Sequence, residues 1–313
     1  MLLVMALLVQ SAVTAQRTVA VTFDDLPVAS ALPLNDADRE TTTARLLTAL
    51  NNRRVPVIGF VNENKLVDES GSVVPRRVEL LQRWLADGHE LGNHTWSHID
   101  LHKVPLAAYE ADILRGEVTT KQLLARRGQV PRYFRHPYLH TPKTPAIRDS
   151  LAAFLAQHGY RIAPVTIDNS DWVFAAAYDR ARARGDDTLA SRVREEYLGY
   201  MLEVIRFYED QARTILGREP AQVLLVHANR LNADSFDRLA EMMAGRGYRF
   251  ITLDQALEDP AYRSKDAYFG DGGITWLHRW AITAKMPGST FQGEPEVPGW
   301  VQQLATQGRP LSY

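Results

Sequence analysis

The stretch RTVAVTFDDLP, residues 17–27, decides the fold prediction. Its first seven residues, 17–23, are mostly apolar or β-branched and predict a buried strand. Two adjacent carboxylates, Asp24 and Asp25, follow this strand. Because successive side chains along a strand point to opposite faces, we expect the two carboxylates to point in different directions. This arrangement suits two separate tasks, such as a metal ligand and a base, but such pairs are also typical of turns and helix caps.

On the C-terminal side of this strand, short apolar runs alternate with longer helical patterns over about 230 residues, which predicts a parallel sheet, open or closed into a barrel. The predicted strands are 17–23, 55–61, 89–94, 132–137, 160–167, 221–228 and 248–253, and the predicted helices are 37–52, 75–88, 105–128, 144–159, 188–216 and 233–247. Active sites in such folds lie at the carboxyl ends of the strands. The polar residues predicted at these ends are Asp24, His94, Arg135, Asp168 and His227.

The composition limits the classes of partner and site. The chain has 313 residues, 45% of them hydrophobic, which is ordinary for a globular protein with a large core. Its net charge of −1 supplies no field that would attract nucleic acid or an anionic membrane, so we expect neither as a partner. The sequence contains no cysteine, which excludes disulfides, thiolate zinc sites and cysteine nucleophiles. Any bound metal must therefore have His, Asp or Glu ligands.

The N-terminus predicts a secretory signal peptide. Residues 2–9 form an apolar run that is too short to span a bilayer, and Val13-Thr14-Ala15 suits signal peptidase cleavage after Ala15. The basic segment of such signals is missing, and a buried strand or helix is the alternative. We therefore expect a secreted, periplasmic or cell-envelope protein without membrane insertion after signal removal. The predicted organisation is a signal at 1–15, a barrel at 16–258, and a Trp/Gly/Pro-rich extension packed on the barrel at 259–313.

The segment HTWSH, residues 94–98, places two histidines four positions apart. On one turn, both imidazoles can bind one metal ion, although most histidines at this spacing have structural roles. The segment is not the HExxH motif, because no glutamate follows the first histidine. His94, His98 and one aspartate would supply two nitrogen ligands and one oxygen ligand, and would leave coordination positions open for water and substrate.

Three further segments place polar groups beside apolar strands. In FRHPYL, residues 134–139, Arg135 lies next to a proline-fixed turn and can bind a carboxylate in bidentate geometry. DNSDW, residues 168–172, has a carboxylate directly before a tryptophan. In LLVHAN, residues 224–229, a histidine ends a strongly apolar strand, where it needs a polar partner. Each segment alone also has a purely structural explanation.

Taken together and in this order, TFDD, HTxSH, RxPY, DxxDW and LxH resemble the five motifs of the polysaccharide deacetylases, also called the NodB-homology or carbohydrate esterase 4 family. The resemblance covers about residues 17–255 and implies an α/β fold, a distorted (β/α)7 barrel. It also implies a metal-dependent N-deacetylase that acts on an N-acetylated glycan of the chitin or peptidoglycan type.

The resemblance assigns roles to individual residues. It implies one divalent metal, Zn²⁺ or else Co²⁺, with Asp25, His94 and His98 as ligands. It implies Asp24 as the general base for the attacking water, Arg135 as its orienting partner and His227 as the general acid. The remaining implied roles are Asp171, which holds and polarises His227; Trp172, which packs nearby; and Tyr138, whose backbone N–H helps to bind the oxyanion.

The sequence also departs from the family pattern. Leu26 follows the two aspartates where the family usually has glycine, and we expect its side chain near the mouth of the site. A long helical segment between Trp172 and His227 and the Trp-rich tail suggest a subgroup with its own substrate preference. Alternative functions are an O-acetyl esterase, a non-sugar amide hydrolase, an inactive carbohydrate-binding relative and, with less support, an Fe(II) oxygenase. Further residues of interest are Trp96, Trp276 and Trp280, which either stack on sugar rings or pack in the core, and His136 and His140, which lie near the site in sequence.

Overall fold

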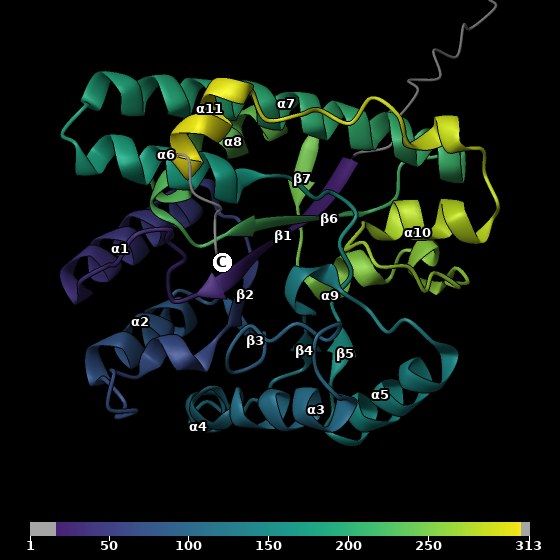
Figure 1. Cartoon of the computed structure of the whole chain (residues 1–313), viewed down its shortest axis with the longest axis horizontal. Helices are drawn as coiled ribbons and strands as arrows, with labels where there is room; N and C mark the ends of the chain where they lie inside the picture. The colour runs from purple at the N-terminus through teal and green to yellow at the C-terminus, as the bar shows by residue number, and fades with distance from the viewer. Residues whose placement is uncertain (1–16, 308–313) are drawn as a thin grey trace, which may run out of the picture.

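The computed structural model describes residues 17–307 (Figure 1). Its centre is a parallel sheet with the strand order β5-β4-β3-β2-β1-β6, and β7 pairs with β1 outside this path. The strands are β1 (Arg17–Leu26), β2 (Val57–Val61), β3 (Glu90–Asn93), β4 (Tyr133–Phe134), β5 (Arg161–Ile162), β6 (Gln222–His227) and β7 (Tyr248–Phe250). The predicted signal peptide lies outside the described residues.

The helices surround this sheet (Figure 1). Five of the six predicted helical segments match an α-helix to within a few residues, and four further α-helices between residues 17 and 307 lie outside the predicted segments. The bounds of the helices are α1 (Asp36–Arg53), α2 (Pro75–Ala86), α3 (Leu106–Arg115), α4 (Val118–Ala125), α5 (Pro145–Gln157), α6 (Asp171–Ala183), α7 (Asp187–Leu216), α8 (Arg230–Gly245), α9 (Leu253–Leu257), α10 (Trp276–Thr283) and α11 (Gly299–Thr306).

Strand β1 organises the sheet because three strands pair with it. Val19 pairs with Gln222 of β6 and also with Phe250 of β7, so β6 and β7 lie on opposite edges of β1. Strand β2 pairs with the later part of β1, from Val21 onward, on the edge that β7 uses at the start of β1. All these pairings are parallel, so the carboxyl ends of the strands meet at one end of the sheet.

The sheet curls into a distorted barrel, which confirms the predicted fold class. The predicted strand 160–167 forms only the short β5 and then leaves regular pairing. Further along, Ile167 makes an isolated parallel bridge to Leu224 of β6. There the Ile167 N–H donates to the Val223 carbonyl at 3.0 Å, and the Leu225 N–H donates to the Ile167 carbonyl at 3.1 Å. The segment after β5 therefore returns to the free edge of β6 through one bridge, without a regular pairing of β5 with β6.

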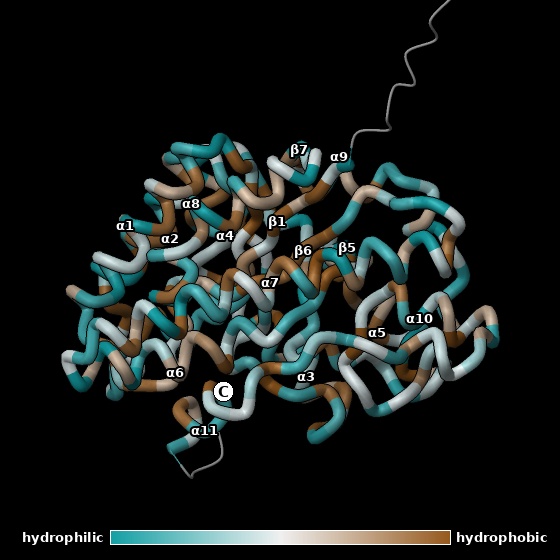
Figure 2. Tube along the Cα trace, turned by 90° about the horizontal axis from the view of Figure 1, so that it is seen from above, coloured by the Kyte–Doolittle hydropathy of each residue, from teal (hydrophilic) through white to brown (hydrophobic). Residues whose placement is uncertain are grey.

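The main core lies between the sheet and the helices α1, α2, α6, α7 and α8. Phe23 of β1 packs edge-on against Trp84 of α2 and also contacts Phe236 of α8, with ring centroids 5.7 and 5.4 Å apart. Figure 2 shows hydrophobic segments concentrated along the central strands and hydrophilic segments along outer turns of the chain. Burial of these aromatic side chains contributes strongly to stability.

The C-terminal segment joins this same core. Val301 and Ala305 of α11 are fully buried, and α11 lies against α6 (Figure 1). Trp280 is buried in the core, so it packs there as one of the two sequence interpretations expected. Trp276 is partly buried, and the Arg279 guanidinium lies 4.7 Å from the centroid of its ring. Between residues 17 and 307, no helix has the length and apolar character that a bilayer crossing requires.

The predicted helix 105–128 is divided in two, which corrects the sequence prediction. Helix α3 ends before Gly116, and α4 begins at Val118. At Gly116 the chain lies against the backbone of the HTWSH segment: a Cβ atom there would lie 2.4 Å from the Thr95 carbonyl carbon and 2.5 Å from the Trp96 nitrogen. Gly116 therefore permits a close approach that no residue with a side chain would allow.

Candidate active site

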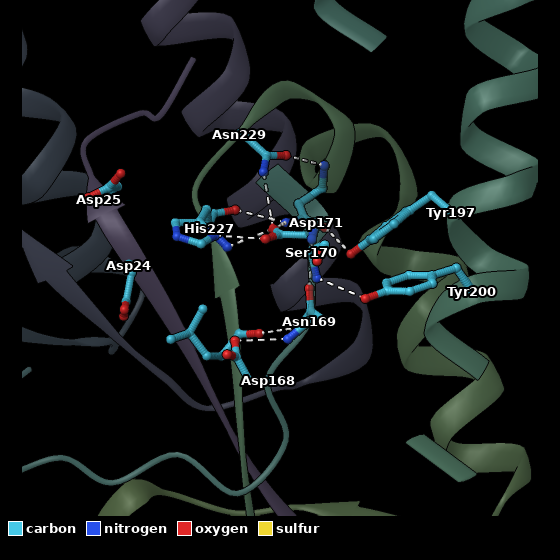
Figure 3. Close-up of polar contacts among 12 residues, drawn as sticks. Asp24, Asp25, Asp168, Asn169, Ser170, Asp171, Tyr197, Tyr200, His227 and Asn229 are labelled. Carbon is cyan, nitrogen blue, oxygen red and sulfur yellow. Dashed lines mark hydrogen bonds and ion pairs between the residues drawn. The ribbon is translucent and has the colours of Figure 1, made fainter. Parts of the chain in front are cut away.

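Polar side chains converge at the carboxyl ends of β1, β3 and β6. Asp24 and Asp25 lie near the end of β1, His94 directly follows β3, and His227 is the last residue of β6. Figure 3 shows the carboxylates of Asp24 and Asp25 pointing in different directions, with His227 facing both from the neighbouring strand. The parallel arrangement of the strands therefore brings residues more than 200 positions apart in the chain into one site.

Asp25, His94 and His98 form a candidate metal centre. One ligand atom from each lies within 4.8 Å of the others, and Asp25 Oδ1 lies 3.8 Å from Nε2 of both histidines. His94 Nδ1 lies 2.8 Å from the Arg135 carbonyl oxygen, which can only accept. Nδ1 must therefore donate, so Nε2 presents its lone pair toward Asp25.

These three residues fit a divalent cation. Asp25 Oδ1 is buried, and within residues 17–307 no hydrogen-bond donor meets it. A buried carboxylate oxygen without a partner is costly, and a cation would satisfy it. Burial lowers the pKa of His94 and of His98 to about 4, so both imidazoles are neutral at pH 7, as metal ligands must be.

The loop of residues 94–98, which carries the two candidate histidine ligands, is not a helical turn. Thr95 and His98 have positive φ angles of 65° and 57°, and Asp25 on the opposite side has a φ of 70°. Side chains from outside the loop hold this backbone: Asn62 Nδ2 donates to the His94 carbonyl at 2.6 Å. Asp112 accepts from the Ser97 N–H at 2.9 Å. The two histidines therefore approach one point through a constrained loop and not through helical spacing.

Asp24 is held by a buried arginine, but not in the bidentate geometry expected from the sequence. Arg135 has no exposed surface, and it donates to Asp24 Oδ2 through one nitrogen at 3.4 Å. Its other terminal nitrogen donates to Thr22 Oγ1 at 3.0 Å. Thr22 lies two residues before Asp24 on the same face of β1, so the guanidinium spans both side chains. Burial raises the pKa of Asp24 despite the opposing charge of Arg135.

His227 and Asp171 form a tightly bonded pair on the other side of the site (Figure 3). Asp171 is the first residue of α6, and its Oδ1 lies 2.7 Å from His227 Nδ1. Burial alone would lower the pKa of His227, but the charge of Asp171 and this hydrogen bond raise it to about 9. The imidazole is therefore positively charged at neutral pH and presents Nε2–H as a proton donor.

Several residues around these groups were not identified from the sequence. Asn229 and Asn232 donate to Asp171 Oδ2 at 3.2 and 2.7 Å, and the cap that Asn229 forms on α8 was the only local signal. Asp168 was noted only as a strand end. It lies beside His227 in Figure 3, and burial raises its pKa to about 7. Lys65 Nζ lies 3.3 Å from Asp25 Oδ2, and no motif identifies it.

Tyr138 and Trp172 lie at the rim. Tyr138 has a positive φ of 59°, and its ring packs on the His98 ring with centroids 4.4 Å apart. The C-terminal segment contacts it, because a Cβ atom on Gly273 would lie 1.8 Å from the Tyr138 carbonyl oxygen. Trp172 is partly buried and lines a groove together with Asp168 and Glu294 of the same C-terminal segment.

Leu26 does not lie at the mouth of the site, contrary to the sequence expectation. It is fully buried, and its side chain occupies the space that a Cβ on Gly59 of β2 would need.

Of the two histidines that lie near the site in sequence, His136 is buried, and its Nδ1 lies 3.0 Å from the Tyr109 hydroxyl. His140 binds Asp100 at 2.8 Å and stacks on the His102 ring. Trp96 lies beneath the Arg115 guanidinium at 4.0 Å.

Comparisons with known proteins agree on one family. The polysaccharide deacetylase family profile matches residues 11–163. A chitin deacetylase of Colletotrichum lindemuthianum is 30% identical over 245 residues, which cover 77% of this chain and 79% of that protein. A chitin deacetylase of Pestalotiopsis sp is 31% identical over 163 residues, or 52% of this chain and 46% of the relative.

Other matches cover less of the relative or are more distant. A peptidoglycan-N-acetylglucosamine deacetylase of Bacillus cereus is 25% identical over 75% of this chain and 66% of its own length. The matched region thus spans less than two thirds of both this relative and the Pestalotiopsis protein. The solved structure of a mutant CE4 family pseudoenzyme superposes with a TM-score of 0.51 at 14% identity, and the match covers 78% of this chain and 68% of the pseudoenzyme chain. This last likeness concerns the fold alone.

Proposed function

We propose that this chain, which belongs to the polysaccharide deacetylase family, removes acetyl groups from acetamido sugars of an N-acetylated glycan of the chitin or peptidoglycan type. One observation supports this proposal above the others. Asp24 Oδ2 lies 3.8 Å from Nε2 of the candidate ligand His94, and His227, held by Asp171, faces Asp24 and Asp25 from the neighbouring strand. Hydrolysis of an amide needs a base for water and an acid for nitrogen, and this arrangement offers one on each side.

The metal, Zn²⁺ or else Co²⁺, would be held by Asp25, His94 and His98, and when bound it would supply Lewis-acid activation of water and of the acyl oxygen. Asp24 takes the proton of the water that attacks the carbonyl carbon. Arg135 keeps the Asp24 carboxylate turned toward His94, whose Nε2 lies 3.8 Å from Asp24 Oδ2. The backbone N–H of Tyr138 contributes to oxyanion binding, and Trp172 lies beside the acyl group.

His227 completes the reaction from the opposite side. An amine anion is a poor leaving group, so the nitrogen must be protonated before the C–N bond breaks. The charged His227 donates its Nε2 proton to this nitrogen, and acetate and a free amine result. Asp171 holds the imidazole by Nδ1 and keeps it protonated before this step.

The test is acetate release from a panel of substrates by metal-stripped and reconstituted protein. We expect release from N-acetylglucosamine oligomers after addition of Zn²⁺ or Co²⁺, and almost none without metal. Release from acetylxylan but not from the oligomers would favour an O-acetyl esterase, and release only from small non-sugar amides would favour an amide hydrolase. Glycan binding without release of acetate would indicate an inactive relative.

The cellular location and the domain limits are part of the same proposal. Chitin and peptidoglycan lie outside the cytoplasm, which agrees with a signal peptide at 1–15 and a secreted or cell-envelope protein. We infer a barrel at 16–258 and an extension at 259–313 that packs on it. Mass determination of the protein exported by the native cell would test cleavage after Ala15.

A further inference from the structure

A second cavity of about 420 Å³ adjoins the candidate metal centre on the side of Asp25 and His98. The loop after β1, residues 28–34, forms one wall, and basic side chains form the other. We name this cavity the cationic pocket and define it by Arg39, Lys65 and Arg77. In its lining, Asp25 is the only acidic residue within the part of the chain that the structure describes.

Lys65 places a positive charge at the junction of this pocket and the metal centre. It lies on the short helix η1 (Glu63–Leu66), and its Nζ donates to the Asp25 carbonyl at 3.0 Å. Within residues 17–307, the hydrogen bonds and ion pairs of Nζ involve Asp25 alone. An ammonium group has three donors. Its side chain is 26% exposed, so a ligand in the pocket can reach it.

Arg39 and Arg77 add charge that their partners do not fully offset. Both guanidinium groups contact the same carboxylate oxygen of Asp36, at 3.3 Å from Arg39 and 2.8 Å from Arg77. Three cations thus share two directly contacting anions, Asp25 and Asp36, while the next acidic groups, Asp24 and Asp38, have the arginine partners Arg135 and Arg230. A divalent metal on Asp25 would add positive charge. A cavity with such an excess attracts an anionic group, most strongly where water is partly excluded.

The opposite side of the site has the reverse charge. The groove lined by Trp172 and Asp168 also contains Glu294 and Glu296, which carry its negative charge. The cationic pocket thus lies next to the candidate metal ligands Asp25 and His98. The groove with Glu294 and Glu296 includes Asp168, which Figure 3 shows near the proposed acid His227. A substrate with one anionic substituent would bind in a single orientation in this field.

We propose that the cationic pocket binds a carboxylate carried by the glycan, on or directly next to the sugar whose acetamido group is hydrolysed. This inference rests on the proposed function and specifies its substrate class as acidic N-acetylated glycans. The carboxylate accepts from Lys65 Nζ, while Arg39 and Arg77 supply the surrounding positive field.

The experiment compares two oligosaccharides that differ only in charge. One contains N-acetylmuramic acid, whose lactyl ether ends in a carboxylate, and the other has this carboxylate converted to the primary amide. Dissociation constants and kcat/KM are measured for both with the full chain, and Lys65→Met is compared with Lys65→Arg. Lys103→Met is the matched control, because it removes the same charge from a side chain that is 79% exposed and outside the pocket.

We expect the wild-type protein to favour the acid over the amide at least about tenfold in binding, and Lys65→Met to reduce this ratio at least about fivefold. Lys65→Arg and Lys103→Met should retain the preference, and rising salt should weaken it. The ratio cancels any loss common to both substrates, such as an indirect effect on Asp25. Equal affinity for the two oligosaccharides, or an unchanged ratio in Lys65→Met, would overturn the pocket assignment.

Two further outcomes separate this inference from the proposed function. Release of acetate from both oligosaccharides at equal rates would leave the deacetylase proposal intact and overturn the pocket. Preferential binding of the acid without any release would support the pocket and contradict the deacetylase. Added acetate tests a free anion as the occupant: inhibition of both substrates alike, relieved by Lys65→Met, would overturn the proposal in favour of product binding.

Discussion

The two sides of the candidate active site differ in how their buried carboxylates are paired. Asp171 accepts hydrogen bonds from the His227 ring and backbone and from Asn229 and Asn232. Asp24 and Asp25, in contrast, each have one buried oxygen that no donor meets within residues 17–307. The side of the proposed acid, His227, is therefore complete within the chain, whereas the side of the candidate metal ligands would be completed by a cation and a substrate.

This difference explains how one site can hold His227 in a fixed orientation and still have unpaired carboxylate oxygens available to a ligand. Asp171 begins α6, and the groups that donate to its carboxylate come from the end of β6 and the start of α8, so the orientation of His227 is set before any ligand binds. The unpaired oxygens of Asp24 and Asp25 on the other side lower the stability of the protein, and a bound cation would offset this cost. Each of the following four tests acts on either the candidate metal ligands or the His227–Asp171 pair, so the unchanged side serves as the control.

The largest effect is expected from His94→Ala on the metal side. Loss of one of three protein ligands should remove the metal and lower kcat/KM at least about 1,000-fold. Metal content after dialysis and acetate release together measure this effect. A variant that keeps both its metal and its turnover would exclude His94 from the ligand set.

On the acid side, His227→Ala should lower kcat about 100- to 10,000-fold with unchanged metal content. The reason is that the leaving nitrogen loses its proton donor while the three candidate ligands stay in place. Paired measurements of kcat and metal content distinguish this result from that of His94→Ala. Full activity in this variant would refute the assignment of His227 as the acid.

Asp171→Asn should give a smaller change that depends on pH. The acid must be protonated, so activity falls as pH rises through the raised pKa of His227, which is about 9. Without the Asp171 charge, burial lowers this pKa, so the basic limb should move at least about one pH unit toward neutrality. The pH dependence of kcat/KM measures the shift. An unmoved basic limb would show that another group governs it.

The smallest effect is a change in thermal stability on metal addition. Zn²⁺ at about 1,000 times its dissociation constant should stabilise the folded protein by about 4 kcal/mol and raise Tm by several degrees. His227→Ala should show the same increase, and His94→Ala should show almost none. Thermal unfolding with and without a chelator measures both. Equal increases in all three proteins would indicate metal binding elsewhere.

Local patterns predicted the strands and the order of the motifs, because both depend on residues close together in the chain. The apolar run before Asp24 and the helical periodicity of 75–88 are examples, and both match elements of the structure. The division of the predicted helix 105–128 was missed because it occurs where Gly116 contacts the backbone of Thr95, about twenty positions away in the chain. Such contacts leave no periodic signal.

The site shows the same limit. Motifs indicated Asp25, His94 and His98, and the fold brings these three together. The division of the Arg135 hydrogen bonds between Asp24 and Thr22 could not be predicted from local sequence, because it depends on how β4 is placed across the sheet from β1. Lys65 is also invisible in local sequence, since its contact with Asp25 joins the connection after β2 to the end of β1.

Gly116 also affects protein engineering. Residues 94–98 hold their shape against a bare stretch of main chain at the α3–α4 junction, with no room for one methyl group. If HTWSH alone were transferred to another scaffold, the two imidazoles would lack the backbone contact that helps to orient them. A functional graft must also include this glycine with the helices on either side of it, Asn62, which binds the His94 carbonyl, and Arg135, whose carbonyl orients the His94 ring.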